Sequence, residues 1–196
     1  MNKAYLPNKE MSMDCFKLIA PAVDVRDIQD ELIVNSDEFG KIPLRTAYEG
    51  SSHKEATDIL LRGPDLYSGK EWTMLALQNE ILCVPLVDKE FMPAAQYWAK
   101  EIMKGVGGVQ LGRVIITKLP AGGKIYEHVD EGDAADWYDR FHLVIQGGEG
   151  DVFHSADETV TMYTGELWWV ENQADHSVEN NMDTDRIHMI LDIRID

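Results

Sequence analysis

The stretch GRVIITKLPAGGKIYEHVD, residues 112–130, decides the fold. An apolar run at residues 113–119 stops at the Pro-Ala-Gly-Gly turn of residues 120–123. Short apolar runs bounded by Gly and Pro are typical of buried strands, so we expect one strand before the turn and a second over residues 124–130. Side chains two residues apart project from the same face of a regular strand. One face of the second strand then carries Lys124, Tyr126, His128 and Asp130.

The rest of the chain repeats this pattern of short strands and turns. Residues 140–146 alternate cleanly, with Phe141, Leu143 and Ile145 on one side of the strand. Further strands are expected at residues 57–62, 151–154, 159–163, 167–170, 176–178 and 186–193. Seven or eight short strands at this spacing indicate a sandwich or jelly roll, so the sequence predicts a mainly β fold with flanking helices.

Two amphipathic helices are expected in the first half of the chain. Asp24 is typical of an N-cap, and Val25, Ile28 and Leu32 follow it at helical spacing. The clearest helix covers residues 89–104, because its apolar side chains form a single stripe.

The domain organisation follows from these elements. We expect residues 110–196 to form the β core, and residues 1–109 to form a helical and irregular extension that packs on the core and contributes outer strands. A chain of 196 residues then makes one compact domain. The surface that recognises a substrate is expected to come from the first 100 residues and from the acidic loop at residues 131–139.

The composition favours a soluble protein. The chain has 18 Lys and Arg against 35 Asp and Glu, a formal net charge of −17. Such a surface repels phosphate backbones and anionic membranes, so we expect neither a nucleic-acid nor a membrane partner. Solubility explains the charge, and a basic protein or peptide substrate is the alternative.

Cysteine usage and hydropathy favour a cytoplasmic location. Cys15 and Cys83 lie far apart with no C-x-x-C motif, which indicates reduced thiols. No apolar stretch resembles a signal peptide or reaches transmembrane length. No pattern specifies an oligomeric state.

The second strand and a later one supply a candidate metal site. His128 and Asp130 would project together, and His176 would come from the later strand. Two imidazoles and one carboxylate make the facial triad of non-haem Fe(II) oxygenases, which leaves positions open for a co-substrate and O2. The same ligands also make catalytic zinc sites, so ligand type alone leaves both metals open.

Arg186, ten residues after His176, favours iron. A guanidinium matches a carboxylate in a two-pronged geometry. The far carboxylate of 2-oxoglutarate has to be neutralised in a dry pocket, and a zinc hydrolase has no such requirement. We therefore predict that Arg186 binds 2-oxoglutarate.

Four more side chains are expected to reach the co-substrate. Arg140 and His142 share a face that points toward the site, where His142 would hydrogen-bond the carboxylate of the oxo-acid nearest the metal. Tyr126 and Asn172 are candidate hydrogen-bond donors at the rim of the pocket.

The remaining candidates are expected to act from behind the site or outside it. His188 shares a strand face with Arg186, and both His188 and Trp169 are expected to support the residues that bind the co-substrate. His53 is interpreted as an exposed loop histidine.

Together these motifs carry a resemblance to a known family. They are Gly112-Arg113-Val114, Leu119-Pro120-Ala121-Gly122-Gly123, His128-Val129-Asp130, Arg140-Phe141-His142, Thr164-Gly165-Glu166, Trp169, Asn172, His176-Ser177-Val178-Glu179-Asn180 and Arg186-Ile187-His188. The set resembles the aspartyl/asparaginyl β-hydroxylase family, a branch of the cupin-like Fe(II)/2-oxoglutarate oxygenases. The resemblance covers about residues 110–195 and reaches back more weakly to residues 53–62.

The resemblance implies a double-stranded β-helix core, with His128 and His176 as iron ligands and Arg186 as the clamp on 2-oxoglutarate. It also implies that Arg140 and His142 line the co-substrate pocket. The animal members of this family carry glycine at the position of Asp130 and manage with two histidine ligands. Here a carboxylate is available, so we expect three protein ligands.

The function that follows is an aspartyl/asparaginyl β-hydroxylase-like reaction. We expect hydroxylation of a protein, peptide or small-molecule substrate, coupled to oxidative decarboxylation of 2-oxoglutarate, with Fe(II) and O2. The alternatives are a non-catalytic cupin-type protein that binds a metal or ligand, and a zinc-dependent hydrolase on the same barrel.

Overall fold

The computed structural model describes residues 14–46 and 48–196. The expectation of an irregular N-terminus without a targeting segment falls mostly on residues 1–13, which lie outside the described residues. The helices are α1 (Arg26–Val34), α2 (Met74–Gln78), α3 (Pro93–Gly105) and α4 (Asp133–Trp137), with a 3-10 turn at Ser36–Glu38. The strands are β1 (Phe16–Ala20), β2 (Thr57–Gly63), β3 (Val84–Pro85), β4 (Gly108–Leu119), β5 (Lys124–His128), β6 (Asp139–Gln146), β7 (Asp151–Ser155), β8 (Glu158–Thr161), β9 (Leu167–Val170), β10 (His176–Asn180) and β11 (Arg186–Ile195).

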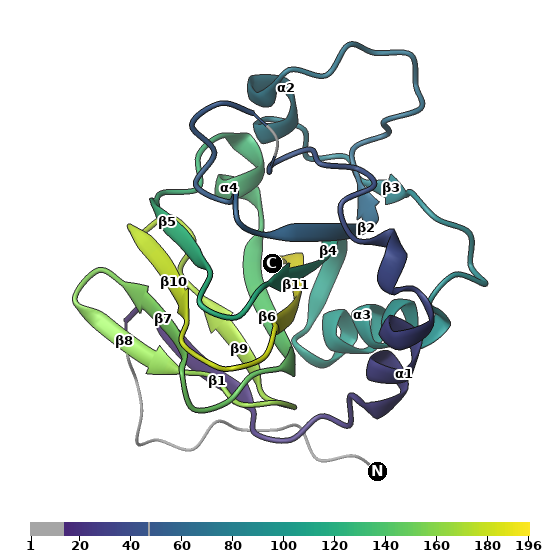
Figure 1. Ribbon diagram of the computed structural model, residues 1–196. Coiled ribbons are helices and arrows are strands. Elements are labelled where there is room, and N and C mark those ends of the chain that lie inside the picture. The colour runs from purple at the N-terminus through teal and green to yellow at the C-terminus, as the bar shows by residue number, and fades with distance from the viewer. Residues whose placement is uncertain (1–13, 47) are drawn as a thin grey trace.

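Within the described residues, these strands form two antiparallel sheets (Figure 1). The larger has seven strands in the order β1-β9-β6-β11-β4-β2-β3, and the smaller has four in the order β5-β10-β7-β8. From β4 onward the chain passes back and forth between the two sheets. That crossing pattern is a double-stranded β-helix, so the predicted jelly-roll fold class is confirmed.

The N-terminal half joins this core. Strands β1, β2 and β3 extend both edges of the larger sheet, and α1 and α3 lie beside each other next to it in Figure 1. Among the described residues, no helix combines the length and apolar character needed to cross a bilayer.

Two hydrophobic clusters cover the two faces of the larger sheet. The outer cluster packs the sheet against the helices and includes Ile28, Leu32, Ala95, Ile102, Ile116, Phe141, Leu143, Ile145, Met189 and Leu191. The inner cluster lies between the sheets and includes Phe16, Leu119, Ile125, Val144, Phe153, Met162, Trp168 and Val178. The predicted alternation in β6 is confirmed, because Phe141, Leu143 and Ile145 face the helices and Val144 faces the smaller sheet.

The same alternation turns a set of polar side chains inward. On β2, β4, β6 and β11 the residues between the outer-cluster positions point toward the smaller sheet. They include Asp58, Arg62, Arg113, Thr117, Arg140, His142, Arg186, His188 and Asp192. A sheet face this rich in ionisable groups is unusual inside a protein, and it marks where the function lies.

The helices begin differently from the prediction. Helix α3 begins at Pro93, four residues later than expected, and its first free backbone N–H groups donate to the Glu31 carboxylate, from Ala94 at 2.6 Å and Ala95 at 3.1 Å. The acidic loop at residues 131–139 contains α4. The N-cap of α1 is Val25 and not Asp24.

Candidate metal centre

A β-bulge in β5 places the first histidine. His176 pairs with His128, and Val178 pairs with Ile125, so three steps along β5 match two along β10. An extra residue in one strand rotates the side chains that follow it. Ile125 and His128 therefore both face inward, and Tyr126 does not.

Two sequence predictions are wrong for this reason. Strand β5 ends at His128 rather than running regularly to Asp130. Tyr126 is 42% exposed, and its hydroxyl donates to Glu55 at 2.5 Å. Tyr126 therefore lies on the outer surface of β5 and away from the predicted pocket.

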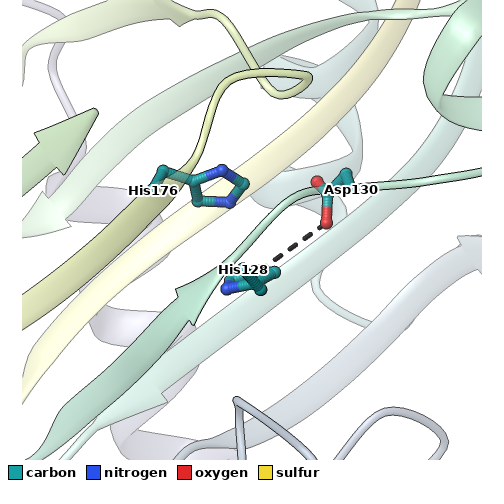
Figure 2. A group of neighbouring side chains, drawn as sticks. All are labelled: His128, Asp130 and His176. Carbon is teal, nitrogen blue, oxygen red and sulfur yellow. Dashed lines mark ion pairs between the residues drawn. The ribbon is translucent and has the colours of Figure 1, made fainter. Parts of the chain in front are cut away.

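His128, Asp130 and His176 converge on one point (Figure 2). One ligand atom from each lies within 4.8 Å of the other two. His128 Nε2 is 3.7 Å from Asp130 Oδ1, and the rings of His128 and His176 have centroids 4.3 Å apart. The structure thus brings the three predicted ligands together, although four strands, β6 to β9, lie between β5 and β10 in the sequence.

The histidine tautomers suit a metal. Nδ1 of His128 lies 2.7 Å from the Tyr126 carbonyl oxygen, and Nδ1 of His176 lies 2.9 Å from that of Ala174. A carbonyl oxygen only accepts, so each Nδ1 carries its proton and each Nε2 offers a lone pair.

The pKa values of the two histidines also favour metal binding. Burial lowers the pKa of His128, and it lowers that of His176 to about 3 with help from the charge of His128. Both rings are neutral at pH 7, which is the form that binds a metal. Nε2 of His128 is buried and has no hydrogen-bond partner within the described residues. A buried imidazole lone pair without a hydrogen-bond donor is available to a metal, so these residues fit a divalent ion.

Asp130 is held from two sides. Its backbone N–H donates to the Asn172 carbonyl at 3.1 Å, and its carboxylate forms an ion pair with Arg140. Arg140 also contacts Asp192 at 2.9 Å. Asn172 is 5% exposed, and its Nδ2 has no partner among the described residues, so a donor beside the cluster is free for a ligand.

His53 lies beside the cluster, and the expectation that it is an exposed loop residue is wrong. Its ring centroid is 4.6 Å from that of His128, and its Nδ1 is 3.1 Å from Ser52 Oγ. Burial, followed by the positive charge of Arg45, lowers its pKa strongly. A third neutral imidazole, beside those of His128 and His176, therefore borders the metal centre.

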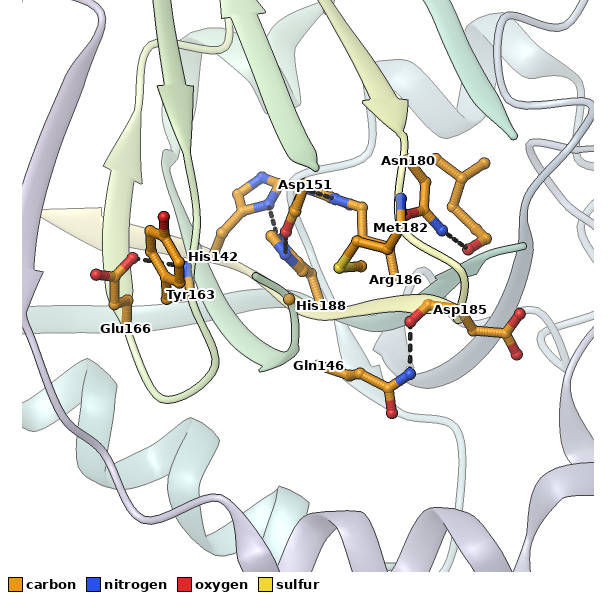
Figure 3. A network of polar contacts seen from close by, with 12 residues as sticks. His142, Gln146, Asp151, Tyr163, Glu166, Asn180, Met182, Asp185, Arg186 and His188 are labelled. Atoms are coloured by element: carbon orange, nitrogen blue, oxygen red, sulfur yellow. Dashed lines mark hydrogen bonds and ion pairs between the residues drawn. The ribbon is translucent and has the colours of Figure 1, made fainter. Parts of the chain in front are cut away.

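Arg186 belongs to a buried polar network (Figure 3). The side chain is 1% exposed, and its Nε donates to Asp151 Oδ1 at 2.5 Å. Its Nη2 lies 2.9 Å from His188 Nδ1, and His188 Nε2 lies 2.8 Å from Asp151 Oδ2. Burial and the charge of Arg186 lower the pKa of His188 to about 4. Burial raises the pKa of Asp151, but Arg186 and His188 outweigh it and bring it down to about 2.

His142 connects this network to the metal centre. Its Nδ1 lies 3.4 Å from that of His188. Its ring is 5.4 Å from Phe153, which in turn is 5.9 Å from the His176 ring and 5.9 Å from Arg186 Cζ. Burial first, and then positive charges that include Arg186, keep the pKa of His142 well below its usual value. The structure therefore places Arg186, His142 and His188 together, close to His176.

A cavity of about 190 Å³ opens on the other side of the cluster. Its metal end is lined by His53, His128, Asp130 and Arg140. The rest comes from β4 and β11, which contribute Arg113, Ile115 and Ile190, and from two segments, the N-terminal half and the segment around α4. These two segments contribute Arg45, Asp58, Leu60, Arg62, Met74, Leu77, Gln78, Glu131 and Ala135 among others. These are the two segments in which the sequence placed substrate recognition.

Trp169 does not support the site, contrary to the prediction. It packs against the outer cluster, and its Nε1 donates to Asp139 at 3.0 Å. Trp168 is the residue that points between the sheets. The side chains of a strand alternate, so only one of two adjacent tryptophans can face the interior.

The sequence also missed three residues of the site: Asp151, Asp192 and His53. A signal existed for Asp192, because Arg186, His188 and Asp192 follow the period of two that puts them on one face of the last strand. Asp151 and His53 carry no local pattern, since their partners come from distant strands.

Fold and site together define the class: a jelly-roll protein with a hydroxylase fold and a cluster of two histidines and one carboxylate. Comparison with known sequences names the group. The Aspartyl/Asparaginyl beta-hydroxylase family matches residues 23–195, and the chain belongs to that family. No curated protein matches the chain.

Solved structures share the fold. A prolyl hydroxylase from Trichoplax adhaerens, in complex with a peptide of hypoxia inducible factor, superposes with a TM-score of 0.64 at 10% identity, over 93% of this chain and 84% of that one. A Pseudomonas putida prolyl-4-hydroxylase gives 0.52 at 14% identity, over 92% of each chain. A 2OG-Fe(II) oxygenase family protein from Burkholderia pseudomallei gives a TM-score of 0.50 at 10% identity, over 71% of this chain and 66% of that one.

Proposed function

We propose that this protein is an Fe(II)- and 2-oxoglutarate-dependent oxygenase that hydroxylates its substrate. The observation that carries the proposal is the convergence of two neutral imidazoles with free Nε2 atoms and one carboxylate on a single point. His128, Asp130 and His176 would hold the iron and leave positions open for other ligands. When bound, the iron supplies O2 activation coupled to oxidative decarboxylation of 2-oxoglutarate.

The chain's own residues orient the co-substrate. Arg186 is a buried cation next to the metal centre, and its Nη1 makes no hydrogen bond within the described residues. We assign this edge of the guanidinium to the far carboxylate of 2-oxoglutarate. Asp151 fixes Nε of the same group and so holds the guanidinium in one orientation.

Other residues act at the near end of the co-substrate. His142, kept neutral by burial, and the unpartnered Nδ2 of Asn172 are the donors proposed for the carboxylate nearest the metal. Arg140 holds Asp130 by an ion pair and thereby fixes the carboxylate ligand. The inner cluster, with Phe153 and Trp168, excludes water from this side.

The substrate would enter through the cavity, which reaches His128 and Asp130. Both a protein or peptide and a small molecule are compatible with a hydroxylase. The peptide bound to the Trichoplax adhaerens enzyme supports the first, and the modest volume of about 190 Å³ supports the second.

Uncoupled turnover tests the proposal without knowledge of the substrate. Purified protein with Fe(II) and O2 is incubated with 2-oxoglutarate, and succinate is quantified by NMR. We expect slow succinate formation that requires Fe(II) and stops when Zn(II) replaces it. Absence of both succinate formation and 2-oxoglutarate binding would favour a non-catalytic protein, and hydrolytic activity with Zn(II) would favour a zinc hydrolase.

A further inference from the structure

The cavity beside the metal centre is lined by four arginines, although the chain as a whole carries a net charge of −17. They are Arg45, Arg62, Arg113 and Arg140. Three carboxylates, Asp58, Asp130 and Glu131, also line the cavity, so the charge that it offers a ligand depends on which arginines lack a carboxylate partner.

Carboxylates neutralise two of the four. Arg45 binds Asp58 through Nε at 2.8 Å and Nη2 at 3.0 Å. Arg140 is shared between Asp130 and Asp192. Neither arginine therefore offers an uncompensated charge to a ligand.

Arg62 has no such partner. Its Nε donates to the Leu111 carbonyl at 2.9 Å and its Nη2 to the Cys83 carbonyl at 2.5 Å. No carboxylate of the described residues lies within 4.0 Å of it. The two backbone contacts fix the side chain and leave its charge unpaired.

Arg113 also lacks a close carboxylate partner among the described residues. Its Nη2 donates to the Leu77 carbonyl at 2.6 Å, and the nearest carboxylate oxygen, on Asp192, is 3.9 Å from its Nη1. Asp192 already contacts Arg140 at 2.9 Å, so it is shared between two cations.

Arg62 and Arg113 form one anion-binding end of the cavity. Both line the cavity, Arg62 from β2 and Arg113 from the neighbouring β4, where Arg62 pairs with Val114, the residue after Arg113. Burial raises the pKa of the nearby Cys83 thiol, Arg113 and Arg62 both lower it, and Asp192 and Glu80 raise it. Glu80 is itself paired with Lys70 at 3.1 Å. Of these two guanidiniums only Arg113 has a carboxylate within 4.0 Å among the described residues, and that carboxylate, Asp192, also contacts Arg140, so positive charge is in excess at this end.

We propose that Arg62 and Arg113 bind a carboxylate of the substrate, while the carbon to be hydroxylated lies at the His128–Asp130 end of the cavity. This inference rests on the proposed function, and it narrows the substrate to an acid. The cavity of about 190 Å³ is smaller than the roughly 300–1,000 Å³ of sites for drug-sized ligands. It fits one small acid or one acidic side chain.

The carboxylate has two sources with the same chemistry. It belongs either to a free acid, such as an amino acid, or to an Asp or Glu side chain of a peptide. A panel separates them: the common L-amino acids, their C-terminal amides, and the blocked peptides acetyl-Gly-Asp-Gly-amide and acetyl-Gly-Asn-Gly-amide.

The first experiment measures binding rather than turnover. Each probe is titrated calorimetrically into the protein with Mn(II) and 2-oxoglutarate, and again into the metal-free protein. We expect at least one free acid, or the Asp peptide, to bind about 10–100-fold more tightly than its neutral partner, the range for hydrogen bonds to a charged group. Equal binding by acids and their neutral partners, or binding by no carboxylate of the panel, overturns the proposal.

Variants then locate the site. Arg113→Gln removes a charge and is expected to weaken the selected acid about 10–100-fold while affinity for its neutral partner changes little. Arg194→Gln is the matched control, because Arg194 also donates to a backbone carbonyl, that of Trp137 at 3.2 Å, but does not line the cavity. An acid that binds Arg113→Gln as well as the natural protein contradicts the assignment.

The variant Arg62→Lys tests the second arginine of the proposed site and keeps a long, positively charged side chain at that position. Lys keeps the charge but loses the two-pronged geometry, so we expect weaker binding of the acid than in the natural protein. Circular dichroism confirms that the variant is folded. Succinate formed without any probe tests the proposed function separately: if it forms while acids show no preference, only this inference fails.

Discussion

Two polar clusters share the inward face of the larger sheet, and they are built differently. The network around Arg186 is closed, and its cation is matched by Asp151, which is 0% exposed. The arginine-lined cavity is open to solvent and holds more positive than negative charge at its Arg62–Arg113 end. The closed cluster holds the Arg186 guanidinium in one orientation with Nη1 free of hydrogen bonds to the described residues, which suits a single ligand of fixed geometry. The open, positively charged end suits a ligand that exchanges with solvent. We assign the first to the co-substrate and the second to the substrate.

Loss of a ligand histidine should have the largest effect, because in the proposed function both the co-substrate and the substrate are oriented toward the metal. His176→Ala is expected to reduce metal affinity by more than the roughly 10–100-fold that loss of an outer hydrogen-bond partner costs. Isothermal titration with Mn(II) measures it. His154→Ala is the control, because His154 forms a side-chain hydrogen bond with Thr159 at 3.0 Å and does not belong to the cluster of His128, Asp130 and His176. Unchanged Mn(II) affinity in His176→Ala would show that His176 is not a metal ligand.

Breaking the closed cluster should cost stability as well as binding. Arg186→Leu leaves Asp151 buried without its cation, which destabilises a protein by about 3–5 kcal/mol. The double variant Arg186→Leu/Asp151→Leu should recover most of that loss in urea unfolding. Neither variant is expected to bind 2-oxoglutarate, while both keep the metal. Tight 2-oxoglutarate binding by the double variant would show that Arg186 is structural.

A fall in pH should lower the free energy of unfolding through the closed cluster, by less than the loss of Arg186 does. The folded-state pKa of His188 is about 4, below its ordinary value of 6.5, so between these values the unfolded chain binds a proton that the native state does not. Stability therefore falls as pH drops below 6.5, by about 2 kcal/mol between pH 7.5 and 5 for this histidine alone. Urea unfolding of the metal-free protein at the two pH values measures the change. A flat profile would mean that His188 is charged in the folded state.

The smallest effect is expected at Asn172. Its Nδ2 has no partner within the described residues, so Asn172→Ala should change the free energy of unfolding by no more than about 1 kcal/mol. Loss of one hydrogen bond should still weaken 2-oxoglutarate about 3–10-fold. A fluorescence titration of the variant against the natural protein decides this, and equal affinity would place Asn172 outside the co-substrate site.

The contrast between these clusters also explains what the sequence could predict. The period of two in β6 and β11 was sufficient to place Phe141 and Leu143 on one face and His142 and His188 on the other. Periodicity is a local property, so it survives without knowledge of the partner strands.

The features that the sequence did not predict depend on partner residues far away in the sequence. The bulge that turns Tyr126 outward exists only because β5 pairs with β10. Asp151 neutralises Arg186 across 35 positions of sequence, and no pattern within either strand signals that pair. The unpaired charge of Arg62 is visible only after every nearby carboxylate has been located.

Binding of 2-oxoglutarate to the Fe(II)-loaded protein under anaerobic conditions tests the central claim most directly. Chelation of Fe(II) by an oxo-acid produces a visible charge-transfer band. We predict that the band forms with one Fe(II) per chain, and that it is absent from His176→Ala and from Arg186→Leu. A natural protein that binds Fe(II) but develops no band with 2-oxoglutarate, or a band that survives in Arg186→Leu at unchanged affinity, would contradict the account.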